Sequence, residues 1–460
     1  MHRRRSRSGR TILRLLFLAA AGAVGLAIFG AVRVGPPPIV EIEPRLPGIG
    51  RQTSIEVRAR ESKRGLAGLR VEFVQGDRVE ALATRAHTPR PAWAFWGPRD
   101  VEDSLTVEVG TETMKGLREG PATIRVVAER AGSWLRSPEP VTIERVLPVR
   151  LRPPSLQVVS SRTYVDQGGS EAVVYRVGES AKKDGVQAGP WWFPGFPLPG
   201  GGAQDRFALF GIPFDLGDAS AVRLVAEDDV GNVSRASFVD RFRPRPFRND
   251  TIRLTESFLE RVVPPILDHE TDLEDAGSVL DNYLAINGDL RSKNARTLIE
   301  LSQRSRPEFL WSDAFVPMRN AQVMSSFADR RTYMYEGRAV DRQDHLGFDL
   351  ASTAMADVQS GNAGVVVLAR FFGIYGNTVV VDHGYGLQTL YGHLSSITVE
   401  EGQEILKGHV LGRTGETGLA GGDHLHFSVL LHGLSVNPAE WWDSHWIHDR
   451  LELKLGPALP

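Results

Sequence analysis

Seven of the twelve histidines of this chain lie between residues 345 and 432, less than a fifth of its 460 residues. In the segment "HLHF" (424–427), two of them are separated by one residue within a stretch that has the composition of a β-strand. Side chains alternate between the two faces of a strand, so His424 and His426 are predicted to share a face, with Leu425 on the other. Imidazoles bind metals and transfer protons near neutral pH. This face is therefore a candidate reaction centre.

Two further segments can supply partners for these histidines. "DHLGFDLAS" (344–352) spaces His345 and Asp349 by four residues, which brings both side chains to one face of a strand or a helix. "LYGHLSS" (390–396) adds His393. A catalytic zinc site needs three nitrogen or oxygen ligands and one open position for water. Two histidines and a carboxylate meet this need in a chain without cysteine, which excludes thiolate ligands and disulfides.

Each of these pairs alone also occurs in ordinary packing, but their combination and order are distinctive. H-x-G-x-D, then histidine in a "Y-x-H-L" context, then H-L-H-F, resembles the lysostaphin- or LytM-type zinc metalloendopeptidases. The resemblance covers about residues 315–440. "SSFADRR" (325–331) is similar to the segment that leads into the first motif of the family, and "GQEILKGHVLGRTGETG" (402–418) is similar to its hairpin before H-x-H.

The resemblance implies a role for each of the five residues. His345, Asp349 and His426 would bind Zn²⁺, and His393 and His424 would be the catalytic pair. The bound zinc would polarise a scissile carbonyl and lower the pKa of its water. One histidine would take the proton of that water and the other would stabilise the tetrahedral intermediate, with the order left open.

Two positions depart from the family pattern. Ala328 stands where the family usually has glycine, and Asp423 adds negative charge beside His424. A neighbouring negative charge raises the pKa of a histidine, so we predict that Asp423 raises the pKa of His424.

The N-terminus predicts attachment to a membrane. "MHRRRSRSGR" has five arginines and no acid, and Leu15–Val32 is an apolar or glycine run of eighteen residues. With Ile12 and Leu13, the run reaches the length of about 20 residues that crosses a bilayer. This length favours an uncleaved anchor over a signal peptide, although "FGA" (29–31) resembles a cleavage site. The positive-inside rule places the first ten residues in the cytoplasm and everything after Arg33 outside.

The remaining chain is predicted to be mainly β, in several domains. Short alternating runs such as "SIEVRAR" (54–60) are typical of strands, and the absence of a long helical period favours β-sandwiches. We predict a cytoplasmic basic tip and transmembrane anchor (1–34), two immunoglobulin-like β-sandwiches (39–149 and 155–243), a helical linker (250–305) and an antiparallel β-sheet metallopeptidase domain (315–442).

Two proline-containing segments affect these boundaries. "VVPP" (262–265) predicts a break between separate helices, because proline disrupts a helix interior. "GPWWFPGFPLPGGG" (189–202) reads as an aromatic loop of the second β-sandwich. It could stack on sugars, although packing over the edge of the sandwich is the preferred interpretation.

The resulting functional hypothesis is a zinc endopeptidase in the bacterial inner membrane, with its C-terminal domains in the periplasm or outside the cell. The resemblance implies the peptides of peptidoglycan as substrate. The formal net charge of −2 gives no reason to expect nucleic acid as a partner. One alternative is a non-catalytic regulator that activates a wall amidase, since some family members have lost the site. Another is a scaffold whose β-sandwiches bind a protein or glycan partner.

Overall fold

The computed structural model describes residues 7–459, so the predictions for the first six residues lie outside the described chain. It is mainly β, with 41% of residues in strands and 19% in helices, which confirms the predicted fold class. Two compact units can be separated. Unit 1 is the chain up to Pro153 together with Glu227–Val233, and unit 2 is the rest of the described chain.

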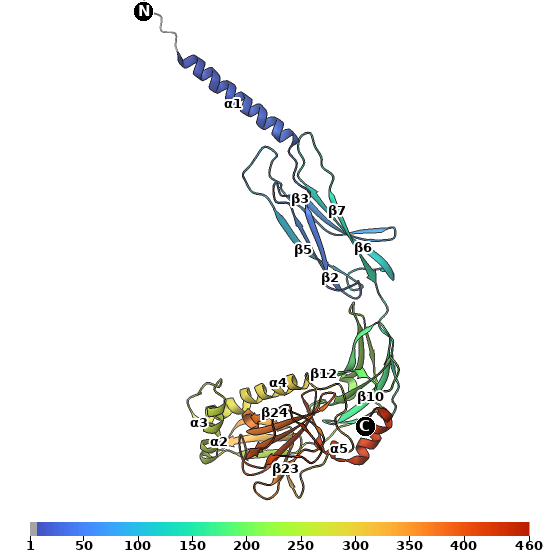
Figure 1. The fold of residues 1–460 in the computed structure, drawn as a ribbon, viewed down its shortest axis with the longest axis vertical. Helices are drawn as coiled ribbons and strands as arrows, with labels where there is room; N and C mark the ends of the chain where they lie inside the picture. The colour runs from blue at the N-terminus through green and yellow to red at the C-terminus, as the bar shows by residue number, and fades with distance from the viewer. Residues whose placement is uncertain (1–6, 460) are drawn as a thin grey trace, which may run out of the picture. The chain divides into compact units, whose positions relative to one another are not determined.

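Unit 1 begins with one long helix, α1 (Arg7–Val32), drawn in blue in Figure 1. Two sheets follow, with strand orders β1-β2-β5 and β4-β3-β6-β7. Their strands are β1 (Ile39–Pro44), β2 (Thr53–Arg60), β3 (Leu66–Gln75), β4 (Arg78–Ala86), β5 (Glu102–Val109), β6 (Gly120–Arg130) and β7 (Val141–Val149). The predicted alternation is present, because Ile55, Val57 and Ala59 of β2 are all buried in one core.

The second β-block of the chain belongs to unit 2, apart from Glu227–Val233. Its strands are β8 (Leu156–Val158), β9 (Tyr164–Asp166), β10 (Ser170–Val177), β11 (Ala181–Ala188), β12 (Trp191–Pro194), β13 (Phe196–Pro197), β14 (Asp205–Gly211), β15 (Val222–Asp228), β16 (Val233–Ala236) and β17 (Arg241–Arg243). Two four-stranded sheets form, β13-β14-β10-β8 and β12-β11-β15-β16. The aromatic segment therefore contributes two strands. Phe196 and Phe207 each lie 4.9 Å from Tyr385, ring centre to ring centre, so this block shares a core with the C-terminal region.

Three helices separate the second β-block from the C-terminal sheet: α2 (Glu256–His269), α3 (Val279–Ala285) and α4 (Arg291–Ser302). The predicted break at "VVPP" is wrong, because α2 runs through Pro264 and Pro265. Both prolines lie on the exposed face of the helix, where water can bond the carbonyl groups that lose their partners. The opposite face buries Leu259, Val262 and Ile266. Its packing outweighs the cost of the missing hydrogen bonds.

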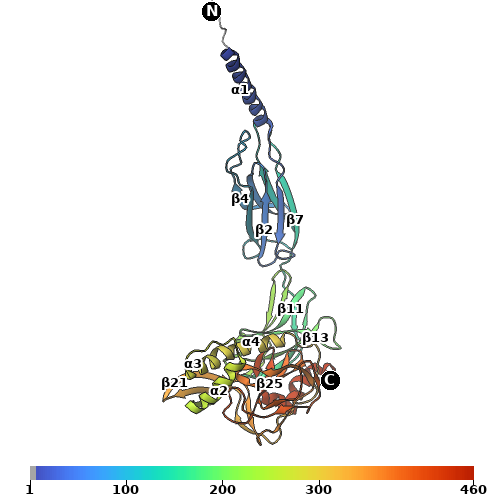
Figure 2. The same cartoon turned by 60° about the vertical axis from the view of Figure 1, so that its left-hand side comes forward.

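The C-terminal region contains an eight-stranded sheet of order β19-β22-β30-β26-β25-β24-β28, with β31 paired to β30. Figure 2 shows α4 lying along this sheet, against which Leu298 packs. The strands of this region are β18 (Asn249–Arg253), β19 (Gln322–Ser325), β20 (Asp329–Tyr335), β21 (Arg338–His345), β22 (Phe348–Ala351), β23 (Asp357–Gln359), β24 (Gly364–Phe371), β25 (Asn377–Gly384), β26 (Leu387–Leu394), β27 (Ser396–Ile397), β28 (Glu404–Ile405), β29 (Val410–Arg413), β30 (Leu425–Leu431) and β31 (Leu434–Val436). The first of these, β18, pairs in parallel with β20.

Short helices close the chain: α5 (Pro438–Trp442), α6 (Ser444–Ile447) and α7 (Leu453–Leu455). Figure 1 shows this end of the chain beside β10, where a buried ion pair forms. Lys454 Nζ lies 2.8 Å from Glu171 Oε1, and the two side chains are 5% and 0% exposed. Burial raises the pKa of Glu171 to about 7, while Lys454 opposes that shift. This ion pair links α7, at the C-terminal end, to β10 of the second β-block.

Removing one charge of this pair should destabilise unit 2 strongly. We expect Lys454→Met to lower the free energy of unfolding by about 3 kcal/mol, because the Glu171 carboxylate stays buried with only Arg450, 3.7 Å away, as a charged neighbour. The double variant Glu171→Gln/Lys454→Met should recover most of that loss. Urea unfolding followed by tryptophan fluorescence measures both. The control is Arg176→Met, which removes the more exposed Arg176–Asp205 pair and should cost less than about 1 kcal/mol. Equal losses in Lys454→Met and the control would contradict this expectation.

Candidate metal and catalytic site

Strand register brings three of the predicted residues together. In the antiparallel pair β22–β30, Asp349 is directly opposite His426, and His345 ends β21, the strand that precedes β22 in the chain. Asp349 Oδ1 lies 2.9 Å from His345 Nε2 and 3.0 Å from His426 Nδ1, and these two nitrogens are 3.1 Å apart. All three residues are buried. They form a group that could hold a metal ion.

The outer hydrogen bonds of the two histidines fix which nitrogen carries a proton. His345 Nδ1 must donate to Ser326 O, a carbonyl acceptor at 3.0 Å. Ser428 Oγ donates its only proton to Leu346 O at 2.8 Å, so it accepts from His426 Nε2 at 3.0 Å. With both rings neutral, the nitrogens that face Asp349 are therefore unprotonated. Three lone pairs then converge on one point, an arrangement that a cation stabilises.

The donor set suits zinc. Zinc bonds of about 2.0–2.1 Å in tetrahedral geometry place ligand atoms roughly 3.3 Å apart, close to the separations in this group. Burial lowers the pKa of His426 to about 4, which keeps its ring neutral and able to ligate. Burial alone would raise the pKa of Asp349, but any protonated histidine of the group, His345 first, attracts and hydrogen-bonds its carboxylate, which lowers that pKa well below its ordinary value. The carboxylate is thus ionised.

The glycine of H-x-G-x-D is required by close packing. A Cβ atom on Gly347 would lie 2.7 Å from Nε2 of His426 and 2.6 Å from Oγ of Ser428. Any side chain at this position would displace the ring and the hydroxyl that orients it. The motif therefore supplies two candidate ligands, His345 and Asp349. Its glycine leaves room for the ring of the third, His426.

The remaining two histidines lie in the same pocket and share one hydrogen-bond pattern. His424 Nδ1 donates to Gly422 O, and His393 Nδ1 donates to Thr417 O, both at 2.7 Å. Nε2 of each neutral ring is therefore free to accept a proton. The ring centres are 4.8 Å apart, and His424 Nε2 lies 3.5 Å from Asp349 Oδ1.

The pKa values of these two histidines shift in opposite directions. Burial, followed by the charges of His424 and His426, lowers the pKa of His393 well below its ordinary value. Burial also acts to lower the pKa of His424, but the hydrogen bond and charge of Asp349 outweigh it and raise the pKa. The sequence-based prediction attributed this rise to Asp423. In the structure, the Asp423 carboxylate instead accepts a hydrogen bond from Met355 N.

A local backbone irregularity directs His393 into the pocket. Regular alternation would place His393 and Tyr391 on the same face of β26. The pairing of β26 with β25 shifts register near this end, and His393 has a left-handed φ of 63°. Tyr391 is consequently 1% exposed in the core, where its hydroxyl accepts from Gly361 N, while His393 lines the pocket. A non-glycine residue in this conformation beside reactive groups indicates function.

Sequence reasoning missed Arg331 on β20. Its guanidinium donates to Asp349 Oδ2 at 2.8 Å, so one carboxylate oxygen faces the histidines and the other is held by arginine. Nearby, Ala328 N donates to His345 O at 2.6 Å, and Ala328 has a φ of 61°. This conformation favours glycine, which explains the family pattern at that position. The alanine retains the same backbone turn. Two residues of "SSFADRR" thus position the candidate ligands. Arg331 holds the second carboxylate oxygen of Asp349, and Ala328 N holds the backbone carbonyl of His345.

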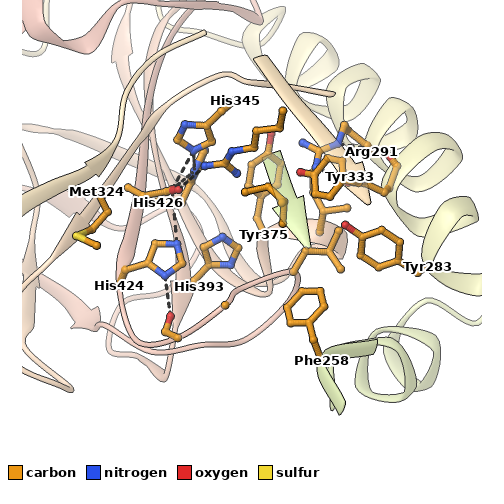
Figure 3. A pocket seen from close by; sticks show the side chains of 18 of the residues that line it. Phe258, Tyr283, Arg291, Met324, Tyr333, His345, Tyr375, His393, His424 and His426 are labelled. Carbon is orange, nitrogen blue, oxygen red and sulfur yellow. Dashed lines mark hydrogen bonds and ion pairs between the residues drawn. The ribbon is translucent and has the colours of Figure 1, made fainter. Parts of the chain in front are cut away.

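The pocket extends from the histidines to the helical segment. Its volume is about 470 Å³. Figure 3 shows the four histidines on one side and Phe258, Tyr283, Tyr333 and Arg291 on the other, with Tyr375 between them. Phe258 and Tyr283 come from α2 and α3. This wall could not be predicted from the sequence, because helix residues that face solvent and helix residues that face a site follow the same periodicity.

Comparisons with known proteins match the C-terminal region. The model of Peptidase family M23 matches residues 343–438. Peptidoglycan DD-endopeptidase ShyA of Vibrio cholerae serotype O1 is 32% identical over 161 residues, 35% of this chain and 34% of the relative. DD-carboxypeptidase/endopeptidase Mpg of Neisseria meningitidis serogroup B is 38% identical over 94 residues, 20% and 22% of the two chains. These matches span about a third or less of the length of each relative.

Among solved structures, a peptidase M23 from Pseudomonas aeruginosa matches 62% of this chain and 96% of its own, at 22% identity and a TM-score of 0.39.

The orienting hydroxyl of Ser428 provides a test of the metal site. We expect Ser428→Ala to weaken zinc binding by about 10- to 100-fold, because Nε2 of His426 loses the acceptor that fixes its tautomer. Competition with a chromophoric chelator measures the affinity. The matched control is Ser435→Ala on the neighbouring strand β31. Unchanged affinity in Ser428→Ala would show that this hydrogen bond does not prepare the ligand.

Proposed function

We infer that the C-terminal region of this chain is a peptidase family M23 domain, because the family model matches residues 343–438, in agreement with the resemblance to the lysostaphin- or LytM-type enzymes. We propose that the protein is a membrane-anchored zinc endopeptidase that cleaves peptide bonds of peptidoglycan. The observation that carries this proposal is the convergence of His345, Asp349 and His426 on one point beside two further histidines with free Nε2 atoms.

The chemistry follows from the proton positions. His345, Asp349 and His426 would hold the zinc ion, which supplies an activated water and polarises a carbonyl when bound. His393 and His424 keep Nδ1 bonded to backbone carbonyls, so each presents Nε2 to the pocket in a fixed orientation. One Nε2 accepts the proton of the attacking water and the other, when protonated, donates to the oxyanion.

The pocket shape is consistent with a peptide substrate. The wall opposite the histidines combines the aromatic rings of Phe258 and Tyr283 with the guanidinium of Arg291, and Arg291 is held by Asn287 at 2.6 Å. Apolar surfaces with a few positioned polar groups are typical of specific ligand sites. The relatives ShyA, a peptidoglycan DD-endopeptidase, and Mpg, a DD-carboxypeptidase/endopeptidase, support wall peptides as the class of substrate.

The apolar helix supports membrane anchoring. Thr11–Val32 is long enough to cross a membrane, since 22 helical residues span about 33 Å. Cleavage after "FGA" would separate the helix from the loop between β6 and β7, because Ala31 O accepts from Leu135 N and from Ser133 Oγ. We therefore propose a retained anchor in the bacterial inner membrane, with the peptidase domain outside the cytoplasm.

Variants of the histidines test the assignments. The full chain in detergent, incubated with purified sacculi, should release products of peptide cleavage. His426→Ala should lose zinc and activity together. His393→Ala and His424→Ala should retain zinc but lose about 10²- to 10⁴-fold in kcat, as expected for removal of proton-transfer groups. His409→Ala, an exposed histidine outside the pocket, is the control.

Two outcomes would contradict this proposal. Zinc-loaded parent protein that releases no peptide product but stimulates a wall amidase would identify the chain as a regulator. Full activity in His393→Ala and His424→Ala would remove both histidines from the mechanism.

A further inference from the structure

Unit 1 exposes a compact group of large apolar side chains. Three of the nine tryptophans of the chain are strongly exposed, Trp93 (46%), Trp96 (68%) and Trp134 (72%), and all three lie on two loops. Phe95 (54%) and Leu135 (75%) lie on the same loops. We call these five residues the loop cluster. Large exposed apolar groups of this kind mark interaction surfaces.

Both loops are bonded to the C-terminal end of α1. The loop between β6 and β7 donates to Ala31 O from Leu135 N at 3.0 Å and from Ser133 Oγ at 2.8 Å. The loop between β4 and β5 accepts from the Arg33 guanidinium at Ala94 O, at 2.9 Å. The loop cluster is therefore tied to the last turn of the helix.

Ring contacts place the loop cluster at the level of that last turn. Phe29 of α1 stacks on Phe95 with ring centres 5.1 Å apart, and the Arg33 guanidinium lies 4.8 Å from the Phe95 ring centre. Gly30 faces Trp93, since a Cβ on this glycine would lie 3.4 Å from Trp93 Cβ. Where α1 crosses a bilayer, these residues are at its interface with water.

The loops are ordered by internal hydrogen bonds. Arg90 is buried, and its guanidinium donates to Phe95 O and Gly97 O, both at 3.0 Å. Ala94 N donates to Pro91 O at 3.1 Å. The aromatic side chains therefore project from a fixed framework, so their exposure is not the result of a loose chain.

We propose that the loop cluster inserts into the interface of the same bilayer that α1 crosses, so that the first β-block rests directly on the membrane. The inference rests on the proposed membrane anchor. Trp is enriched where acyl chains meet headgroups, because its ring is apolar and its N–H is polar. The Arg33 guanidinium lies against the Phe29 ring and donates to Ala94 O, so it adds a positive charge at the level expected for the headgroups. Continuity with α1 favours lipid over a protein partner as the occupant of this surface.

The absence of cysteine from the sequence permits site-specific labelling of the full chain. Trp96→Cys and Leu135→Cys place a polarity-sensitive fluorophore on each loop. Val79→Cys is the matched control, because Val79 is 56% exposed in the same unit. It lies seven residues along β4 from Ala86, roughly 23 Å from the end that leads into the loop. Circular dichroism checks that each labelled chain is folded.

The labelled proteins are reconstituted in phosphatidylcholine–phosphatidylglycerol vesicles. A phospholipid with a nitroxide near the top of its acyl chain should quench the labels at 96 and 135 at least twofold more than the label at 79. Iodide in the water should quench them less than it quenches the label at 79. Labels at 96 and 135 that behave like the label at 79 would overturn the inference.

Resistance of the chain to carbonate extraction from the vesicles separates this inference from the anchor on which it rests. Extraction of the parent chain would reject the anchor, and with it the docking of the loops. Retention of the chain with water-exposed labels would leave the anchor in place and reject the docking. Labels shielded from both quenchers would indicate contact with a second copy of the chain, which also rejects the lipid interface.

Discussion

The site depends on the convergence of three lone pairs on one point. Ser326 O and Ser428 Oγ accept hydrogen bonds from the outer N–H groups of His345 and His426. The nitrogens that face Asp349 are therefore unprotonated when the rings are neutral. Three acceptors within about 3 Å repel one another unless a cation lies among them. The register of β22 and β30 makes this geometry possible, because a slip by one residue would turn either side chain to the other face.

The predicted site residues follow from simple rules, and the misses have physical causes. Alternation along a strand places His424 and His426 on one face. His345 and Asp349 were expected on one face of a single element, but they come together from the end of β21 and from β22. Arg331 was missed because β20 pairs with β21 through a hairpin whose register the sequence does not determine. The direction of His393 depends on a register shift and a left-handed residue, neither of which has a sequence signature.

The mainly β architecture and the apolar helix were predictable from periodicity, whereas the grouping of the parts was not. The second β-block and the C-terminal sheet share one core, through contacts such as Phe207 with Tyr385. Contacts between segments so distant in sequence leave no local pattern. At α2 the local pattern was misleading, because its two prolines predicted a helix break that the structure does not show. Burial of Leu259 and Ile266 outweighs the low helix propensity of proline. That helix contributes Phe258 to the pocket wall, so the error concerned an element that lines the candidate site.

The zinc K-edge X-ray absorption spectrum of the purified full chain tests the central claim most directly. The account predicts a four-coordinate zinc with nitrogen and oxygen neighbours at about 2.0–2.1 Å and outer-shell scattering from two imidazole rings. In His426→Ala, any zinc retained should show one imidazole fewer. A chain that binds no zinc, or zinc surrounded only by oxygen with no imidazole scattering, would contradict the assignment of His345, Asp349 and His426 as its ligands.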